Sequence, residues 1–285
     1  MSSTTTKVLA GCGVGCLLAV VALGGLGWMG YRWARTAAEV VETAERAERQ
    51  LDEEYGPTRD FLPPNDGRVS GSRMEKFLAV REATMPERQA LAESIEALVP
   101  TEGEGRTAAG FRAARAGISM APRMLEFARA RNEALLEAGM GQGEYAWIYW
   151  LSYHAWLGHP AGESLLDDIM ERRSESDGAV QMHFDGFGTE EAMRQLRRDI
   201  RAMLRNLEQK LEGRSEAAEI HQLLQAELAA MDEDPHRMPW EDGLPEALAV
   251  GLDPYRERLE SSYSPATNPF ELLELSSGPH GVTVE

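Results

Sequence analysis

The chain has 285 residues, enough for one large or two small domains, and its 43% apolar and 27% charged residues are typical of a folded protein. Its formal net charge is −18, and because Lys7 is the only charged residue before position 32, the part from residue 32 onward carries −19. Nucleic-acid binding needs clustered Lys and Arg, so this charge argues against a nucleic-acid partner. It favours a basic protein partner or simple solubility.

The N-terminal region combines a short tail, residues 1–7, with an uncharged run at residues 8–31. As a helix, the 24 residues of this run would span roughly 36 Å, compared with about 30 Å for the hydrocarbon core of a bilayer. We therefore predict a single-pass transmembrane helix. The residues expected at its membrane interface are aromatic or basic, namely Trp28, Tyr31, Arg32, Trp33 and Arg35.

Two other interpretations of this run are less favourable. It is longer than the apolar part of a cleaved signal peptide. The stretch ending at Cys12 looks like a lipidation box, but here the apolar residues follow the cysteine instead of preceding it. Gly11, Gly15 and Ala19 make a ridge of small residues, which predicts a homodimer through the membrane helix. The alternative is that glycine is simply common in membrane helices.

The direction in which the helix crosses the membrane is ambiguous from charge. Lys7 precedes the run, whereas Arg32, Arg35, Arg46 and Arg49 follow it, which by the positive-inside rule places the larger part in the cytoplasm. A short tail with one lysine is instead typical of a bacterial signal anchor, which leaves that part outside. The strong preference for Arg over Lys also suggests a GC-rich bacterial genome. We favour a bacterial inner membrane with the domain on the extracytoplasmic side.

The remaining chain divides into a helical stalk at 32–55, a loop or linker at 56–71, a helical domain at 72–275 and a flexible tail at 276–285. The stalk carries an apolar stripe on one helix face, which could pack on its own domain or on the stalk of a second copy: Ala37, Val40, Ala44, Ala47 and Leu51. The loop is marked by Gly and Pro.

Helix-start signals follow the loop. Ser72 with Glu75 and Thr84 with Glu87 have the spacing of capping boxes. The next segment, from 112 to 138, looks helical with an interruption near residues 117–122, where Gly and Pro occur.

A long amphipathic helix is predicted from Thr189 to Gly213, and a second begins at Ser215. Because their connection is short, we expect an antiparallel hairpin. Short helices are expected near 244–250 and 254–260, in a region rich in proline. No segment alternates apolar and polar residues as a half-buried strand does. The fold class is therefore all-α, with the transmembrane helix and stalk followed by an irregular multi-helix bundle.

The segment 144–159 is the most unusual part of the domain, because apolar groups occur on every face of the predicted helix. We interpret it as a buried central helix. The alternative is a pocket for an apolar or flat ligand, lined by Tyr145, Trp147, Tyr149, Trp150, Tyr153, His154 and Trp156.

Candidate chemical groups are scattered. His154, His159, His183 and Asp185 could contribute to a metal or haem site, but their spacing matches no recognised ligand motif, and we expect no metal and no cofactor. Glu163 and Asp167 are four residues apart and could form an acid–base pair if buried.

Three functional hypotheses remain. The leading one is a membrane-anchored interaction protein, scaffold or envelope component that binds another protein. The second is a ligand-binding domain built on the aromatic helix. The third is an enzyme that uses a histidine and carboxylate site. The chain contains no nucleophile elbow and no Walker loop, which lowers the case for a hydrolase or an NTPase.

Overall fold

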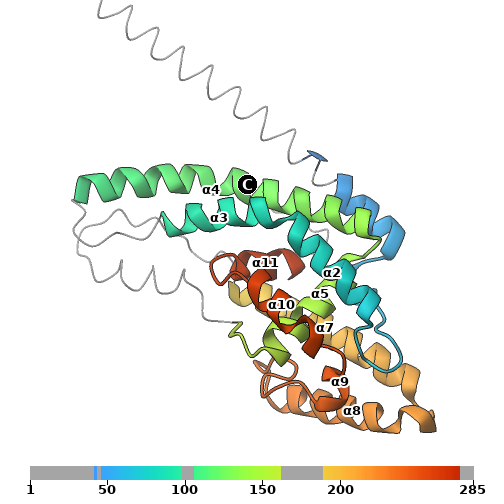
Figure 1. Ribbon diagram of the computed structural model, residues 1–285. Helices are drawn as coiled ribbons and strands as arrows, with labels where there is room; N and C mark the ends of the chain where they lie inside the picture. Colours follow the sequence, from blue (N-terminus) through green and yellow to red (C-terminus); the bar gives the residue numbers. More distant parts are fainter. Residues whose placement is uncertain (1–41, 44–45, 98–105, 162–188, 277–285) are drawn as a thin grey trace, which may run out of the picture. The chain divides into compact units, whose positions relative to one another are not determined.

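A computed structural model describes residues 42–43, 46–97, 106–161 and 189–276 (Figure 1). Every regular element within these ranges is a helix, which confirms the all-α class for them. Residues 1–43 and 44–285 form two separate units, and the helices from residue 46 onward belong to the second. None of the helices in the described ranges is both long and apolar enough to cross a bilayer.

The predicted membrane segment lies outside the described residues. This applies to the span at 8–31, to its small-residue ridge and to its aromatic and basic interface residues. It applies equally to the C-terminal tail from residue 277 onward.

The helices occur in the following chain order. A helix at 46–55 comes first. The elements after it are η1 (Thr58–Asp60), α2 (Gly71–Ala83), α3 (Met85–Glu96), α4 (Arg106–Ala138), α5 (Gln142–Tyr149), η2 (Trp150–Trp156), α7 (Thr189–Leu211), η3 (Ser215–Ala217), α8 (Ala218–Glu233), α9 (Glu246–Ala249), η4 (Asp253–Tyr255), α10 (Arg256–Ser262) and α11 (Asn268–Ser276). Element η2 is a π-helix and continues α5 without a break.

The predicted interruption near residues 117–122 is wrong, because helix α4 continues through it. It runs unbroken from Arg106 to Ala138 with Pro122 inside it, and α2 and α3 both pack against it (Figure 1). Proline removes one intrahelical hydrogen bond and strains one turn, a local cost of about 3 kcal/mol. Tertiary contacts offset that cost here, since Phe127 and Leu135 on the following turns are 1% and 0% exposed.

The predicted capping boxes do not form. Helix α2 begins at Gly71, so Ser72 lies inside it, and neither α2 nor α3 has a side-chain cap. Thr84 does precede α3, but its backbone is not extended as an N-cap requires. Its hydroxyl instead donates to the Val80 carbonyl, 2.9 Å away.

The hairpin of α7 and α8 is confirmed, with the two helices packed side by side. Leu196, Ile200 and Leu207 on α7 are at most 1% exposed. Gly213 ends the first helix with a positive φ of 75°, a conformation that glycine adopts without strain. The Arg197 guanidinium on α7 donates to the carbonyl of Met231 at 2.7 Å, at the C-terminal end of α8, where cations are favoured.

The helix at 46–55 packs on its own domain. Leu51 is 1% exposed and belongs to the main hydrophobic core, and Ala47 is also buried. Two glycines at the start of α5 allow close contact with this helix and with η1. A Cβ atom at Gly141 would lie 2.6 Å from the Cβ of Tyr55, and one at Gly143 would lie 2.5 Å from the Thr58 carbonyl oxygen.

We predict that Gly143→Ala destabilises the protein by about 1–3 kcal/mol, because the new methyl group meets backbone that cannot move aside. Gly71→Ala is the matched control, since its Cβ would meet only the flexible end of Tyr255, at 3.0 Å. Urea unfolding of the full chain in detergent, followed by tryptophan fluorescence, measures both. Equal effects of the two substitutions would contradict this account of the contact.

Candidate functional site

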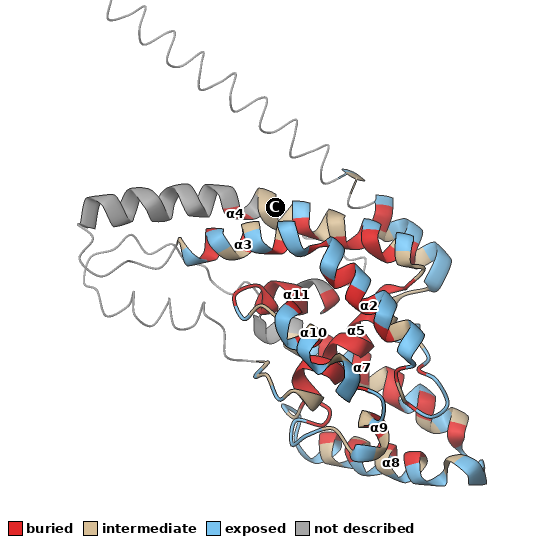
Figure 2. Ribbon diagram, in the orientation of Figure 1, coloured by how far each residue is buried: buried red, intermediate tan, exposed pale blue. Residues whose placement is uncertain are grey.

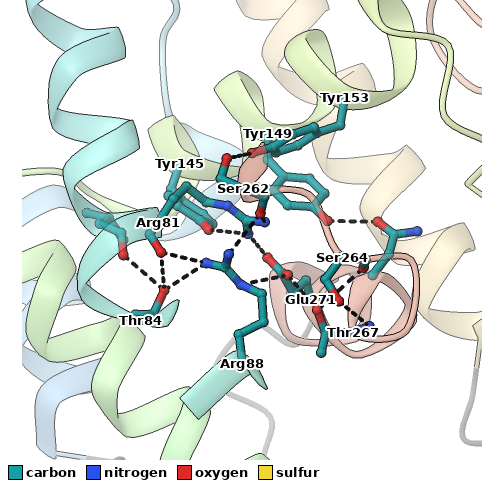
Figure 3. Close-up of polar contacts among 12 residues, drawn as sticks. Arg81, Thr84, Arg88, Tyr145, Tyr149, Tyr153, Ser262, Ser264, Thr267 and Glu271 are labelled. Atoms are coloured by element: carbon teal, nitrogen blue, oxygen red, sulfur yellow. Dashed lines mark hydrogen bonds and ion pairs between the residues drawn. The ribbon is translucent and has the colours of Figure 1, made fainter. Parts of the chain in front are cut away.

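The most densely connected polar group of the described residues is an ion-pair cluster at the junction of three helices (Figure 3). Arg81 comes from α2, Arg88 from α3 and Glu271 from α11. Their side chains are 0%, 5% and 1% exposed. Arg81 pairs directly with the carboxylate, and Arg88 Nε lies 3.4 Å from its other oxygen.

Neighbouring polar groups complete the cluster. The Ser262 carbonyl at the end of α10 accepts hydrogen bonds from both guanidinium groups, that of Arg88 at 2.8 Å. Arg88 also donates to the Thr84 hydroxyl at 2.9 Å, and Thr267 donates to Glu271 at 3.1 Å. The cluster therefore joins α2 and α3 to the C-terminal helices, which are nearly 200 residues distant in sequence.

The charge balance of the cluster is uneven, with two guanidinium groups on one carboxylate. Burial disfavours the charged form of Arg81, but the Glu271 carboxylate and the three neighbouring tyrosines together outweigh it and hold the pKa of Arg81 well above its usual value. The guanidinium also lies 5.1 Å from the ring centre of Tyr153 and 5.3 Å from that of Tyr149. Aromatic faces stabilise a desolvated cation, so these rings share in holding the charge.

The tyrosines of the aromatic helix line one side of this cluster. Tyr145 accepts a hydrogen bond from Arg81 at 3.2 Å, Tyr149 donates to Asn268 Oδ1 at 2.7 Å, and the hydroxyl of Tyr153 lies 2.7 Å from that of Ser262. Burial raises the pKa of Tyr145 and Tyr149, so both are neutral at physiological pH. Each buried hydroxyl thus has a protein partner.

The tryptophans of the same helix face other elements. Trp147 meets Trp240 edge to face at 5.9 Å, and Trp150 Nε1 donates to the Pro239 carbonyl at 2.9 Å. Trp156 is only partly buried. The Arg256 guanidinium carbon lies over its ring, 4.2 Å from the ring centre of Trp156. These contacts to protein groups are those of a buried central helix, and α5 is coloured as buried along most of its length in Figure 2.

The loop that meets these tryptophans contains a strained residue. Trp240 has a positive φ of 53°, which non-glycine residues rarely adopt. Its backbone N–H donates to the buried Glu227 carboxylate at 2.9 Å, and Arg237 pairs with the same carboxylate. The surrounding contacts hold the strained backbone in place.

His154 is buried within the π-helix, where its ring stacks on Trp150 at 4.7 Å. Its Nδ1 lies 2.8 Å from the backbone carbonyl of His159. The ring of His159 stacks on Tyr263 at 3.9 Å. The other predicted candidates, His183, Asp185, Glu163 and Asp167, lie outside the described residues. Among the residues that are described, no three His, Cys, Asp or Glu side chains are placed to hold a metal ion.

The sequence interpretation missed the ion-pair cluster. Arg81 follows Phe77 by four positions and therefore lies on the apolar face of α2, a signal that was present in the sequence. Glu271 gave no such signal, because α11 lies in a proline-rich stretch for which no helix was predicted.

We predict that Glu271→Gln destabilises the protein by about 3–5 kcal/mol, since it leaves buried guanidinium charge without a counter-ion. Arg258→Met is the control: Arg258 also bridges two helices through Glu75 and Glu82, but these side chains are 42–55% exposed. Exposed pairs contribute about 1 kcal/mol or less. If urea unfolding gives Glu271→Gln no larger an effect than Arg258→Met, the cluster does not hold the helices together.

Comparison of the chain with protein-family models, with curated proteins and with solved structures finds no match in any of the three.

Proposed function

We propose that this chain is a single-pass membrane protein whose helical domain acts by binding another protein, as a scaffold, adaptor or envelope component. The uncharged run at 8–31 supports the anchor. The charge of −19 on the rest of the chain supports a partner with a basic surface.

The burial of the ion-pair cluster is the observation that carries the proposal. Arg81 and Glu271, at 0% and 1% exposed, have their charges engaged with each other. A catalytic or ligand site needs polar groups that converge where a small molecule can reach them. These side chains instead connect helices. The tyrosine hydroxyls of the aromatic helix are used in the same way, because they bond to Arg81, Asn268 and Ser262.

Among the described residues, one stretch of the sequence is both exposed and strongly acidic. Residues 232–260 contain nine carboxylates against three arginines, and every one of these carboxylates is exposed. Opposite charge on a partner raises the rate of encounter and fixes its orientation. We therefore place the partner's contact on this stretch.

The test is site-specific photo-crosslinking of the full chain in native membranes. A crosslinker at Glu246 or Glu257 is expected to give one discrete protein adduct, weakened by 0.5 M salt because exposed charges are screened. Crosslinkers at Glu93 and Glu126, on α3 and α4, are the matched controls and are expected to give less of that adduct.

Charge neutralisation provides the second arm of this experiment. Combining Glu233→Gln, Glu246→Gln and Glu257→Gln is expected to reduce the adduct at least severalfold, whereas Glu93→Gln, Glu96→Gln and Glu126→Gln together leave it unchanged. No adduct from any position, or equal loss with both sets, would contradict an acidic docking surface.

A further inference from the structure

We propose that His154 is an acid-sensitive latch, which holds residues 157–161 on the end of the aromatic helix while neutral and releases them when protonated. This goes beyond the proposed function, because it assigns a pH response to the domain itself. It stands on the geometry around one buried imidazole ring.

The latch closes the C-terminal end of the π-helix. The N–H of Leu157 donates to the Ser152 carbonyl at 3.0 Å, and that of His159 donates to the Tyr153 carbonyl at 2.9 Å. Gly158 between them has a positive φ of 73°, as in a glycine helix terminus. His154 adds a side-chain bond to this turn through the His159 carbonyl.

This bond fixes which nitrogen of His154 can take up a proton. A carbonyl oxygen only accepts, so Nδ1 carries the hydrogen and donates it at 2.8 Å. Nε2 is then the basic atom. It is buried and makes no hydrogen bond while neutral, so a proton added there would bring a charge into the core.

The groups around the ring compensate for only part of that charge. Trp150 and Tyr149 cover it from its own helix, and His159 lies across the turn. From α11, Asn268 and Glu271 both favour the charged ring, although the Glu271 carboxylate is shared by two arginines and the nearby His159 opposes the charge. Burial therefore dominates and lowers the pKa of His154 to about 4.

The direction of the pH response follows from the difference between the pKa of His154 when it is buried and when it is exposed. Residues 157–161, when released, expose His154, whose pKa then returns to 6.5, so the released form binds more protons between pH 6.5 and 4. Acid thus favours release as pH falls through this window. From these two pKa values, the population of the released form rises about 100-fold between pH 7 and pH 4.

His159 is the other titratable group in this turn that could respond to acid. Burial lowers the pKa of His159 as well, while Glu260 acts in the opposite direction. Its ring stacks on Tyr263, next to the Ser262 carbonyl that holds both cluster arginines. Release of this turn would therefore remove a contact from the α10 end of the ion-pair cluster.

The experiment is hydrogen exchange by mass spectrometry on the full chain in lipid nanodiscs at pH 7, 5.5 and 4, corrected for intrinsic exchange rates. In the wild type, protection of peptides covering 157–161 is expected to fall by about 100-fold, while α8 keeps its protection. His154→Asn places an amide donor near the position of Nδ1 but cannot be protonated, so the pH dependence of 157–161 is expected to shrink to about twofold. His236→Asn, at an exposed histidine, is the matched control and is expected to behave as the wild type.

Two outcomes would overturn the proposal. Equal loss of protection in the wild type and in His154→Asn would assign the response to another group. Simultaneous loss in α8 and in 157–161 of the wild type would show global acid unfolding, and this comparison decides the question even if the variant does not fold.

Discussion

The ion pair between Arg81 and Glu271 is the contact on which the arrangement of the described helices depends. It joins α2 to α11, and both side chains are shielded from water. Taking two charges out of water costs several kcal/mol per ion, so such a pair persists only when further hydrogen bonds accompany it. Arg88, Thr267 and the Ser262 carbonyl supply them here.

The aromatic helix is the second element of this arrangement. Its tyrosine rings lie over the Arg81 guanidinium, and its tryptophans hold the loop at 237–241 through the Pro239 carbonyl and the Trp240 ring. One helix thus contacts the charged cluster on one side and the C-terminal loops on another. The π-helical turn at its end brings His154 to the carbonyl of His159, which connects the core to the turn that follows.

Much of the helical pattern could be predicted from the sequence. Local signals predicted the apolar stripe of α7, its end at Gly213 and the α7–α8 hairpin. An amphipathic period and a glycine helix terminus can both be recognised from neighbouring residues alone. The prediction for α4 was wrong because the local breaking effect of Pro122 is outweighed by packing on α2 and α3, which local patterns do not show. The capping boxes failed because α2 begins before Ser72, and because the Thr84 hydroxyl donates back to the Val80 carbonyl instead of capping α3.

The candidate site was less predictable than the fold. The aromatic segment was recognised, but its partners were not. Arg81 and Glu271 are 190 positions apart, and no local sequence pattern links residues at that separation. The alternative of an apolar pocket arose from composition, which counts aromatic rings without showing what they face. In the structure those rings face Arg81, Trp240 and Tyr263.

The most direct test of this account is a double-mutant cycle on the buried pair, with Arg81→Met, Glu271→Met and their combination, each measured by urea unfolding of the full chain. The predicted coupling energy is about 2 kcal/mol or more, because Glu271→Met leaves the buried Arg81 charge without its carboxylate and the double variant removes that charge. Arg88 is the same in both variants and does not enter the difference. A coupling energy below about 0.5 kcal/mol, the level at which independent sites are additive, would contradict it.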